Sequence, residues 1–204
     1  MIVAIDGPAA SGKSTTAKMV AKKLKMTYLD TGAMYRAVTL ALLRSNTDLD
    51  DYDSVYQVVD ELELDIYDQG AKTVVKLDGE DVSQAIRSMP VTKNVSAVSA
   101  VKHVREAMVK IQRNIGKKTN CVVEGRDIGT VVFPDAEFKI FMVADDKIRA
   151  ERRLKELHEM GENRSLQEVL TDLKRRDEKD STRVHSPRSE EHTSELQSRE
   201  TISY

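Results

Sequence analysis

The sequence predicts an α/β fold, and three observations support this class. A short apolar, β-branched run over residues 1–5 is followed by a glycine-rich turn and then by apolar residues at helical spacing. Two further apolar runs, 120–124 and 138–143, have the length and composition of buried strands. Helical stretches separate the runs, and this alternation is typical of an α/β domain.

Periodicity predicts the other elements in order. Apolar residues three or four positions apart predict helices over 15–24, 33–43, 54–63 and 97–115, and the charge-rich segment 146–183 is also expected to be helical. Residues 64–67 and 73–77 alternate in period two around the turn signal Asp68-Gln69-Gly70, which predicts an antiparallel hairpin. Because a hairpin interrupts the α/β alternation, we assign it to an insert. The apolar face of the 97–115 helix is expected in the core: Val98, Val101, Val104, Met108, Ile111 and Ile115.

The composition excludes several classes of protein. Hydrophobic residues make up 40% of the 204 residues and charged residues 32%, which suits one globular domain with a sizeable insert. A net charge of −2 argues against a constitutive nucleic-acid or anionic-membrane binder. The single cysteine, Cys121, cannot form an internal disulfide, and the four histidines lack zinc-ligand spacing. With no signal peptide and no membrane-length apolar run, we expect a cytoplasmic protein.

The end of the chain differs in character from the rest. Residues 188–198 read as the in-frame translation of a common short-read sequencing adapter, and 202–204 fit its continuation. We therefore expect a gene truncated near Val184 and a non-native, disordered tail over 184–204, which is excluded from fold reasoning. The alternative is a native polar C-terminal tail.

A phosphate-binding loop follows the first strand. Gly7 and Gly12 let the backbone curl so that its N–H groups converge on phosphate oxygens, and the next helix adds its positive N-terminus. Lys13 reaches the β- and γ-phosphates, and the Ser14 hydroxyl is the expected Mg²⁺ ligand. The motif therefore predicts ATP or GTP with Mg²⁺. The loop comprises Gly7, Pro8, Ala9, Ala10, Ser11, Gly12, Lys13, Ser14 and Thr15.

The loop does not identify the phosphoryl acceptor, because motors, GTPases and small-molecule kinases share it. The sequence has no guanine-reading Asn-Lys-x-Asp motif, which disfavours a regulatory GTPase. Arginines grip phosphate oxygens bidentately, so an excess of them favours transfer between two nucleotides, although each one alone could be a solvated surface residue. The arginines considered are Arg36, Arg105, Arg126, Arg152, Arg153, Arg164, Arg175, Arg176 and Arg183.

Five segments together resemble the bacterial cytidylate kinases. They are 5–8 (IDGP), 29–36 (LDTGAMYR), 77–82 (LDGEDV), 124–136 (EGRDIGTVVFPDA) and 176–183 (RDEKDSTR). The resemblance runs from residue 2 to about 183 and implies a P-loop NTPase-type, doubly wound parallel sheet. It further implies a kinase domain over 1–183, with a nucleoside-monophosphate-binding insert at about 32–103 and a short lid at about 152–168.

The resemblance also implies roles for individual residues. Arg36 and Arg126 match arginines on the acceptor's α-phosphate, and Thr31 matches a residue facing the acceptor. Positions that read cytosine match Ser96, Arg105 and Asp127. Contacts to the sugar and phosphates match Arg176, Asp180 and Arg183, and arginines that swing over the γ-phosphoryl match Arg152 and Arg153. A catalytic set of Lys13, Arg126, Arg152 and Arg153 follows.

Chemistry supports the cytosine assignment. The Asp127 carboxylate can accept a hydrogen bond from the N4 amine of cytosine, whereas uracil would present a carbonyl to it. A second role for Asp127, holding Mg²⁺ through water, ranks lower.

The expected reaction is ATP + CMP to ADP + CDP, with dCMP also accepted, by a monomer that binds neither nucleic acid nor membrane. Rival interpretations are a P-loop kinase of another metabolite such as shikimate or dephospho-coenzyme A, a UMP/CMP kinase, a non-catalytic nucleotide switch, or an inactive truncated product. The family continues past Arg183 with a strand and a closing helix, so their absence should leave a sheet edge open.

Overall fold

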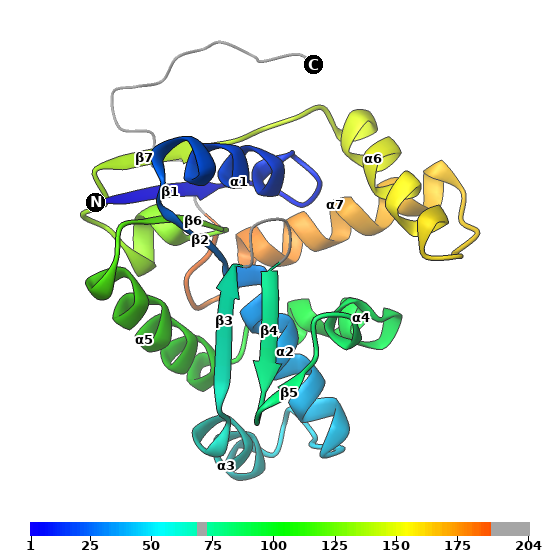
Figure 1. Ribbon diagram of the computed structural model, residues 1–204. Helices are drawn as coiled ribbons and strands as arrows, with labels where there is room; N and C mark the ends of the chain where they lie inside the picture. Colours follow the sequence, from blue (N-terminus) through cyan, green and yellow to red (C-terminus); the bar gives the residue numbers. More distant parts are fainter. Residues whose placement is uncertain (69–72, 189–204) are drawn as a thin grey trace.

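The computed structural model describes residues 1–68 and 73–188, which form a four-stranded parallel sheet joined to a smaller antiparallel one (Figure 1). The parallel sheet has the order β2-β6-β1-β7. Its strands are β1 (Ile2–Asp6), β2 (Thr27–Asp30), β6 (Cys121–Gly125) and β7 (Phe138–Phe141). The three strands expected from apolar runs are confirmed. β2 was not predicted, because its four residues, Thr-Tyr-Leu-Asp, contain no apolar run.

Helices cover both faces of the parallel sheet. One face, with Val3 and Ile5, packs on α1 (Lys13–Leu24). The alternate residues, such as Ala4 and Val123, face the other side, where α2 (Thr31–Arg44) and α5 (Lys102–Lys118) lie. Since side chains alternate across a strand, two buried faces require continuous apolar runs, as the sequence shows. The doubly wound α/β class is confirmed.

The insert contains the expected hairpin. β3 and β4 pair antiparallel from Leu64↔Leu77 to Asp68↔Thr73, while the turn expected after Asp68 lies at 69–72, outside the described residues. Buried side chains from α2, β4 and 82–91 give the insert a core of its own. The insert lies below the parallel sheet in Figure 1. The hairpin strands are β3 (Leu64–Asp68) and β4 (Thr73–Leu77). The remaining elements of the insert are α3 (Tyr52–Glu61), β5 (Glu80–Asp81), η1 (Ala85–Arg87) and α4 (Met89–Val98).

The prediction of a single helix over 97–115 is wrong, because parts of two helices occupy this region. α4 ends at Val98 and α5 begins at Lys102, with an extended backbone at Val101 between them. Arg105 of α5 donates from Nη1 to the Ser99 carbonyl oxygen at 3.2 Å. This hydrogen bond links α5 to the segment that separates the two helices. Both helices bury apolar residues in one core, so the spacing continues across the break and hides it. The six residues expected in that core are confirmed there, fully or partly buried.

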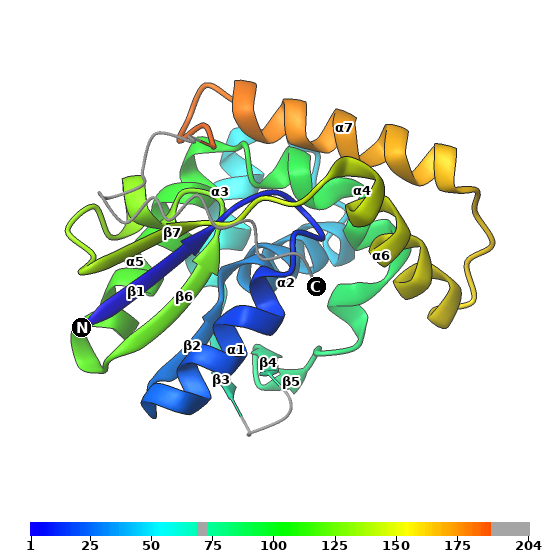
Figure 2. The same cartoon turned by 90° about the horizontal axis from the view of Figure 1, so that it is seen from above.

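The segment 146–183 is helical as expected, but it consists of two helices. α6 (Asp146–Glu159) and α7 (Leu166–Thr182) pack together around Ala150, Leu157, Val169 and Leu173. Figure 2 shows them beyond the end of the sheet toward which β1 points. A short turn, η2 (Ile128–Val132), follows β6.

β7 forms one edge of the parallel sheet. Within the described residues it pairs only with β1, as expected for an open edge. Phe138 and Ile140 are 44% and 42% exposed, and Val143 just beyond them is 68% exposed. This strand and its continuation thus carry three exposed large apolar side chains.

Of the tail expected over 184–204, residues 189–204 lie outside the described part of the chain. Residues 184–188 turn back along α7, where the Arg188 backbone N–H donates to the Asp180 carbonyl oxygen at 2.8 Å. Among the helices of the described segments, none is both long and apolar enough to cross a membrane.

Candidate active site

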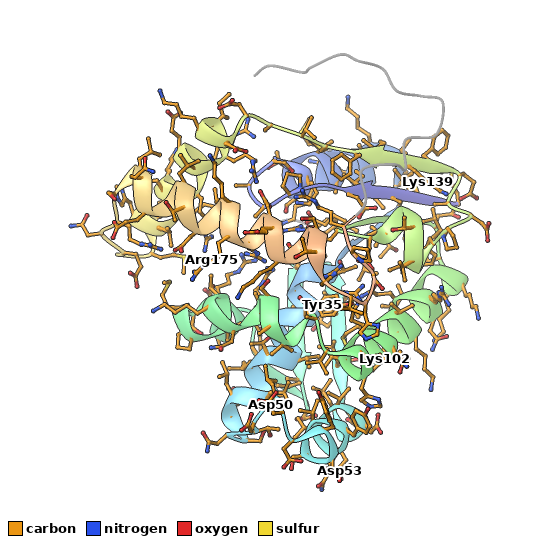
Figure 3. All side chains as sticks on the ribbon, turned by 180° about the vertical axis from the view of Figure 1, so that it is seen from behind. Tyr35, Asp50, Asp53, Lys102, Lys139 and Arg175 are labelled. Atoms are coloured by element: carbon orange, nitrogen blue, oxygen red, sulfur yellow. The ribbon has the colours of Figure 1, made fainter. Side chains whose placement is uncertain are left out.

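The site lies where the parallel strands end. β1 runs into the phosphate loop, β2 into Thr31 at the start of α2, and β6 into Arg126 and Asp127. Because the carboxyl ends of parallel strands meet at one edge, segments distant in sequence converge there. Figure 3 shows Tyr35, from α2, among the side chains between this edge, α7 and α5.

The phosphate loop has the backbone that its glycines predict. Gly7 and Gly12 have φ of 147° and 100°, a region that favours glycine. A Cβ on Gly7 would lie 2.1 Å from the Met142 carbonyl oxygen, so only glycine fits against the segment after β7. α1 begins at Lys13, directly after Gly12, and points its free N–H groups into the loop. The cradle therefore fits a triphosphate.

Lys13 is buried at the centre of this loop. Its Nζ donates to the Pro8 carbonyl oxygen at 2.8 Å, and the residue is 6% exposed. Burial, followed by the charge of Arg126, lowers the pKa of Lys13 to about 7. A buried cation with one carbonyl partner is poorly neutralised, so a phosphate would stabilise its charged form.

Four arginines from different elements surround the same space. Burial and the charges of Arg126, Arg36 and Arg153 lower the pKa of Arg176 to about 10. The Nε atoms of Arg36 and Arg176 are buried and find no hydrogen-bond partner within 1–68 and 73–188. Like charges gathered with unused donors form a site for anionic oxygens. The structure thus brings Lys13 together with Arg36, Arg126, Arg153 and Arg176.

A second group lies beside this cationic cluster and contains the residues expected to read a base. Arg105 Nη2 forms a short ion pair with Asp127, and Arg183 Nη2 lies 3.5 Å from the other Asp127 oxygen. Arg105 also stacks over the Tyr35 ring, 5.5 Å from its centroid. Burial raises the pKa of Tyr35 to about 12. These side chains form a buried polar group that contains both acceptor and donor atoms.

Asp180 joins the two groups. Its Oδ2 accepts from Arg126 Nε at 3.1 Å, and Ser96 Oγ donates to its Oδ1 at 3.4 Å. Burial alone would raise the pKa of Asp180, but the charges of Arg126, Arg176 and Arg183 hold it below the usual value. An ionised Asp180 therefore fixes Arg126 and keeps Ser96 beside it.

Thr31 and Arg36 are held by the end of β2. The Thr31 hydroxyl donates to the Glu124 carbonyl oxygen at 2.7 Å, which ties α2 to β6. Asp30 caps α2 through the Ala33 N–H at 2.9 Å and pairs with Arg36 at 3.3 Å. The N-terminus of α2 is thus fixed beside the phosphate loop.

The two arginines expected to act from the lid, Arg152 and Arg153, lie on α6. Arg152 Nη1 donates to the Ser11 carbonyl oxygen of the phosphate loop at 3.3 Å, while Arg153 pairs with Glu156 at 2.8 Å. Arg164 and Arg175 both pair with Asp172 instead, at 2.6 and 2.9 Å. Arg175, labelled beside α7 in Figure 3, is 67% exposed and so matches the solvated-surface alternative, while Arg164 is half-buried in its ion pair.

Two further residues of the site, Glu124 and Arg149, were not predicted from the sequence. Glu124 is buried, and it accepts from Ser14 Oγ at 2.9 Å and from Tyr28 through a short hydrogen bond. Burial and the nearby Asp30 charge raise the pKa of Glu124. The signal for Glu124 was available, since a carboxylate ending a buried strand before glycine is costly without a partner.

The second of these residues is Arg149 of α6. It donates to the Ala9 carbonyl oxygen at 3.1 Å and pairs with Asp146 and Asp177 at 2.6 and 2.7 Å. It therefore links α6 and α7 to the phosphate loop. No sequence pattern distinguishes Arg149 from the other basic residues of a charged helix.

The oxygen ligands near Ser14 suit Mg²⁺. A hydroxyl beside a carboxylate is a donor set that this ion prefers, and Glu124 supplies the carboxylate. Asp127, the residue weighed for this role from sequence, is occupied by Arg105 and Arg183 instead.

The fold and this geometry define a P-loop phosphotransferase, in which the phosphate loop lies beside a cluster of arginines. Residues 3–194 match the family described as cytidylate kinase. The chain is 47% identical to the cytidylate kinase of Clostridioides difficile (strain 630) over 187 residues, covering 92% of this chain and 85% of the relative. The chain belongs to the cytidylate kinase family.

Two further relatives agree. The cytidylate kinase of Caldanaerobacter subterraneus subsp. tengcongensis is 49% identical, over 91% of this chain and 81% of its own length. That of Fusobacterium nucleatum subsp. nucleatum is also 49% identical, over 92% and 84%.

Proposed function

We propose that this chain transfers the γ-phosphoryl group of ATP to CMP and dCMP, giving ADP with CDP or dCDP. The observation that carries the proposal is the cationic cluster, which lies between the phosphate loop and the buried Arg105–Asp127 ion pair. Transfer between two nucleotides needs such a cluster because it brings many negative charges together.

The phosphate loop holds the donor. Its backbone N–H groups bind the triphosphate, and Lys13 stabilises charge on the transferring group. Ser14 and Glu124 would hold Mg²⁺, which when bound neutralises charge on the phosphate oxygens. Glu124 keeps the Ser14 hydroxyl oriented for this ligand role.

The acceptor's phosphate lies against Arg36 and Arg126, and its base against Asp127. Each Asp127 oxygen keeps a second lone pair while it binds an arginine, so it can still accept from the N4 amine of cytosine. Uracil would place a carbonyl there and leave two acceptors facing each other. Arg36 and Arg126 align the acceptor oxygen with the γ-phosphorus, and little covalent chemistry remains for the protein.

Asp180 favours acceptance of both sugars. Arg126 and Ser96 already donate to its two oxygens, so no ribose 2′-hydroxyl is required to satisfy it. Arg176 and Arg183 would complete the contacts to the phosphates and sugar of CMP or dCMP.

Two parts of the 1–183 kinase domain should move over the substrates: the insert at about 32–103 and the lid at about 152–168, with Arg152 and Arg153. Closure would exclude water, which otherwise takes the phosphoryl group. We further propose that the chain acts as a monomer in cytoplasmic pyrimidine metabolism.

The proposal is tested by coupled ADP release with ATP and Mg²⁺ across CMP, dCMP, UMP, AMP, GMP and shikimate. Rapid turnover is expected with CMP and dCMP alone. Turnover with shikimate, or equal turnover with UMP, would favour the rival kinases. ATP binding without turnover on any acceptor would favour a nucleotide switch or an inactive product.

A further inference from the structure

Asp6 is a buried carboxylate at the end of β1 that no catalytic or binding role yet explains. It is 5% exposed, and each of its oxygens has one backbone partner. Oδ1 accepts from the Ile128 N–H at 2.9 Å, and Oδ2 accepts from the Gly129 N–H at 2.8 Å. Both donors belong to the first turn of η2.

The two amides that Asp6 binds follow directly after Arg126 and Asp127. The first N–H groups of a helical turn have no partner within the turn and carry partial positive charge. An anion from another strand satisfies both needs, so Asp6 caps η2 from β1. The segment that contacts the acceptor is therefore fixed by the strand that ends in the phosphate loop.

We propose that Asp6 is a positioning residue that holds the acceptor-binding segment, Arg126-Asp127, in register with the phosphate loop. Asp6 immediately precedes Gly7, the first residue of the phosphate loop. Its carboxylate accepts from the N–H of Ile128, the residue that follows Asp127. Arg126 and Asp127 cannot shift relative to Lys13 without breaking two buried hydrogen bonds. Phosphoryl transfer depends on such alignment to within a fraction of an ångström.

The geometry requires a carboxylate rather than any polar side chain. Two N–H groups point at two acceptor oxygens, and asparagine would offer one acceptor and one donor. The amide nitrogen would face an N–H and leave it unpaired. Burial, and to a lesser extent the Asp127 charge, raises the pKa of Asp6 to about 6. An ionised carboxylate is therefore costly at this position, and the hydrogen bonds from the Ile128 and Gly129 N–H groups offset part of that cost.

The test is Asp6→Asn, which keeps the size of the side chain and removes one hydrogen bond. The KM for CMP should rise about tenfold, and the CMP/UMP ratio of kcat/KM should fall about tenfold, while the KM for ATP changes less than about twofold. Loss of active protein alone would lower kcat and leave both KM values and the ratio unchanged. That result would overturn the proposal.

A second measurement needs no variant. Hydrogen exchange of the unchanged chain should show the Ile128 and Gly129 amides strongly protected, and rapid exchange there would overturn the proposal. Asp51→Asn is the matched control, since Asp51 caps α3 through the Ser54 N–H far from the site and asparagine caps equally well. This control should keep wild-type kinetics. Asp6→Glu, which keeps both acceptors but displaces them, should also weaken CMP selectivity.

The inference rests on the proposed function, yet the two fail differently. Absence of CMP turnover in the unchanged chain contradicts the function. Unchanged selectivity in an active Asp6→Asn enzyme contradicts only the role of Asp6.

Discussion

Lys13 shows how a single residue of this site is kept ready for its ligand. Its ammonium is buried against one carbonyl oxygen, with Arg126 and Arg176 as like-charged neighbours. These surroundings disfavour its charge in the free chain, and phosphate oxygens would remove the penalty.

Lys13→Ala should lower kcat at least about 100-fold, because it removes a preorganised positive charge from the transferring phosphoryl group. Coupled ADP release measures the loss. The thermal unfolding midpoint should be unchanged or higher, since the variant removes a buried charge. Turnover near the wild-type level would contradict the assignment of the loop.

The lowered pKa of Lys13 predicts proton uptake when ATP binds. With a pKa of about 7 the lysine is largely neutral in the free chain at pH 8, and phosphate restores its charge. Calorimetry in two buffers of different ionisation enthalpy should therefore give different binding heats at pH 8, and Lys13→Met should remove the difference. Equal heats for the unchanged chain would contradict the shift.

The same shift has a defined effect on stability. Between about pH 7 and the ordinary lysine pKa, the unfolded chain binds a proton that the folded chain does not. The Lys13 contribution to the free energy of unfolding therefore rises with pH across that window.

Asp127→Asn should reduce the preference for CMP over UMP by about 10- to 100-fold in kcat/KM, the worth of a hydrogen bond to a charged acceptor. Asparagine is preferred to alanine because its amide oxygen can still accept from Arg105 Nη2, whereas alanine would leave that buried donor without its side-chain acceptor. Competition between CMP and UMP in one assay measures the ratio. An unchanged ratio would remove Asp127 from base recognition.

At the scale of elements, α7 depends on its first turn. Ser165 Oγ accepts from the Glu168 N–H at 3.3 Å, and the Glu168 carboxylate accepts from the Ser165 N–H at 2.8 Å. This capping box fixes the end of the 160–165 connection and thus where α7 begins.

Ser165→Ala should lower the free energy of unfolding by about 1 kcal/mol, as the loss of an N-cap usually does. Urea unfolding measures the change, and exchange of the first α7 amides should increase. Thr171→Ala on the same helix is the control: its hydroxyl only bonds back to the Gln167 carbonyl, so stability should be kept. Equal losses in both variants would contradict the cap.

The elements also show which features a sequence can predict. Apolar runs located β1, β6 and β7, and alternation located the hairpin, because burial imposes those periods. Spacing could not find the break at 99–101, where two helices share one core, nor the four-residue β2. Glu124 and Asp6 act through contacts with residues over a hundred positions away in the chain, which only the fold reveals.

At the scale of the whole molecule, the cationic cluster is divided among several elements, some of which belong to the parts that we propose move. Lys13 and Arg126 belong to the sheet core, Arg36 to α2, Arg153 to α6 and Arg176 to α7. Mutual repulsion favours an open arrangement, and bound phosphates would reverse it.

The radius of gyration should therefore decrease when donor and acceptor bind together, and less when ATP binds alone. Small-angle scattering with an adenosine–cytidine bisubstrate polyphosphate measures the change. Arg153→Ala should reduce the difference between the two states. An unchanged radius with the bisubstrate analogue would contradict closure.

The open edge of β7 favours slow aggregation of the purified chain during storage. On the side away from β1, its N–H and C=O groups pair with no strand of the residues 1–68 and 73–188, and beside the exposed Phe138 and Ile140 they form a template on which a strand of another molecule can add. Because the net charge is only −2, little repulsion opposes that addition. Shelf life should therefore shorten as the stock is concentrated, and Ile140→Lys should lengthen it in light-scattering records taken over days.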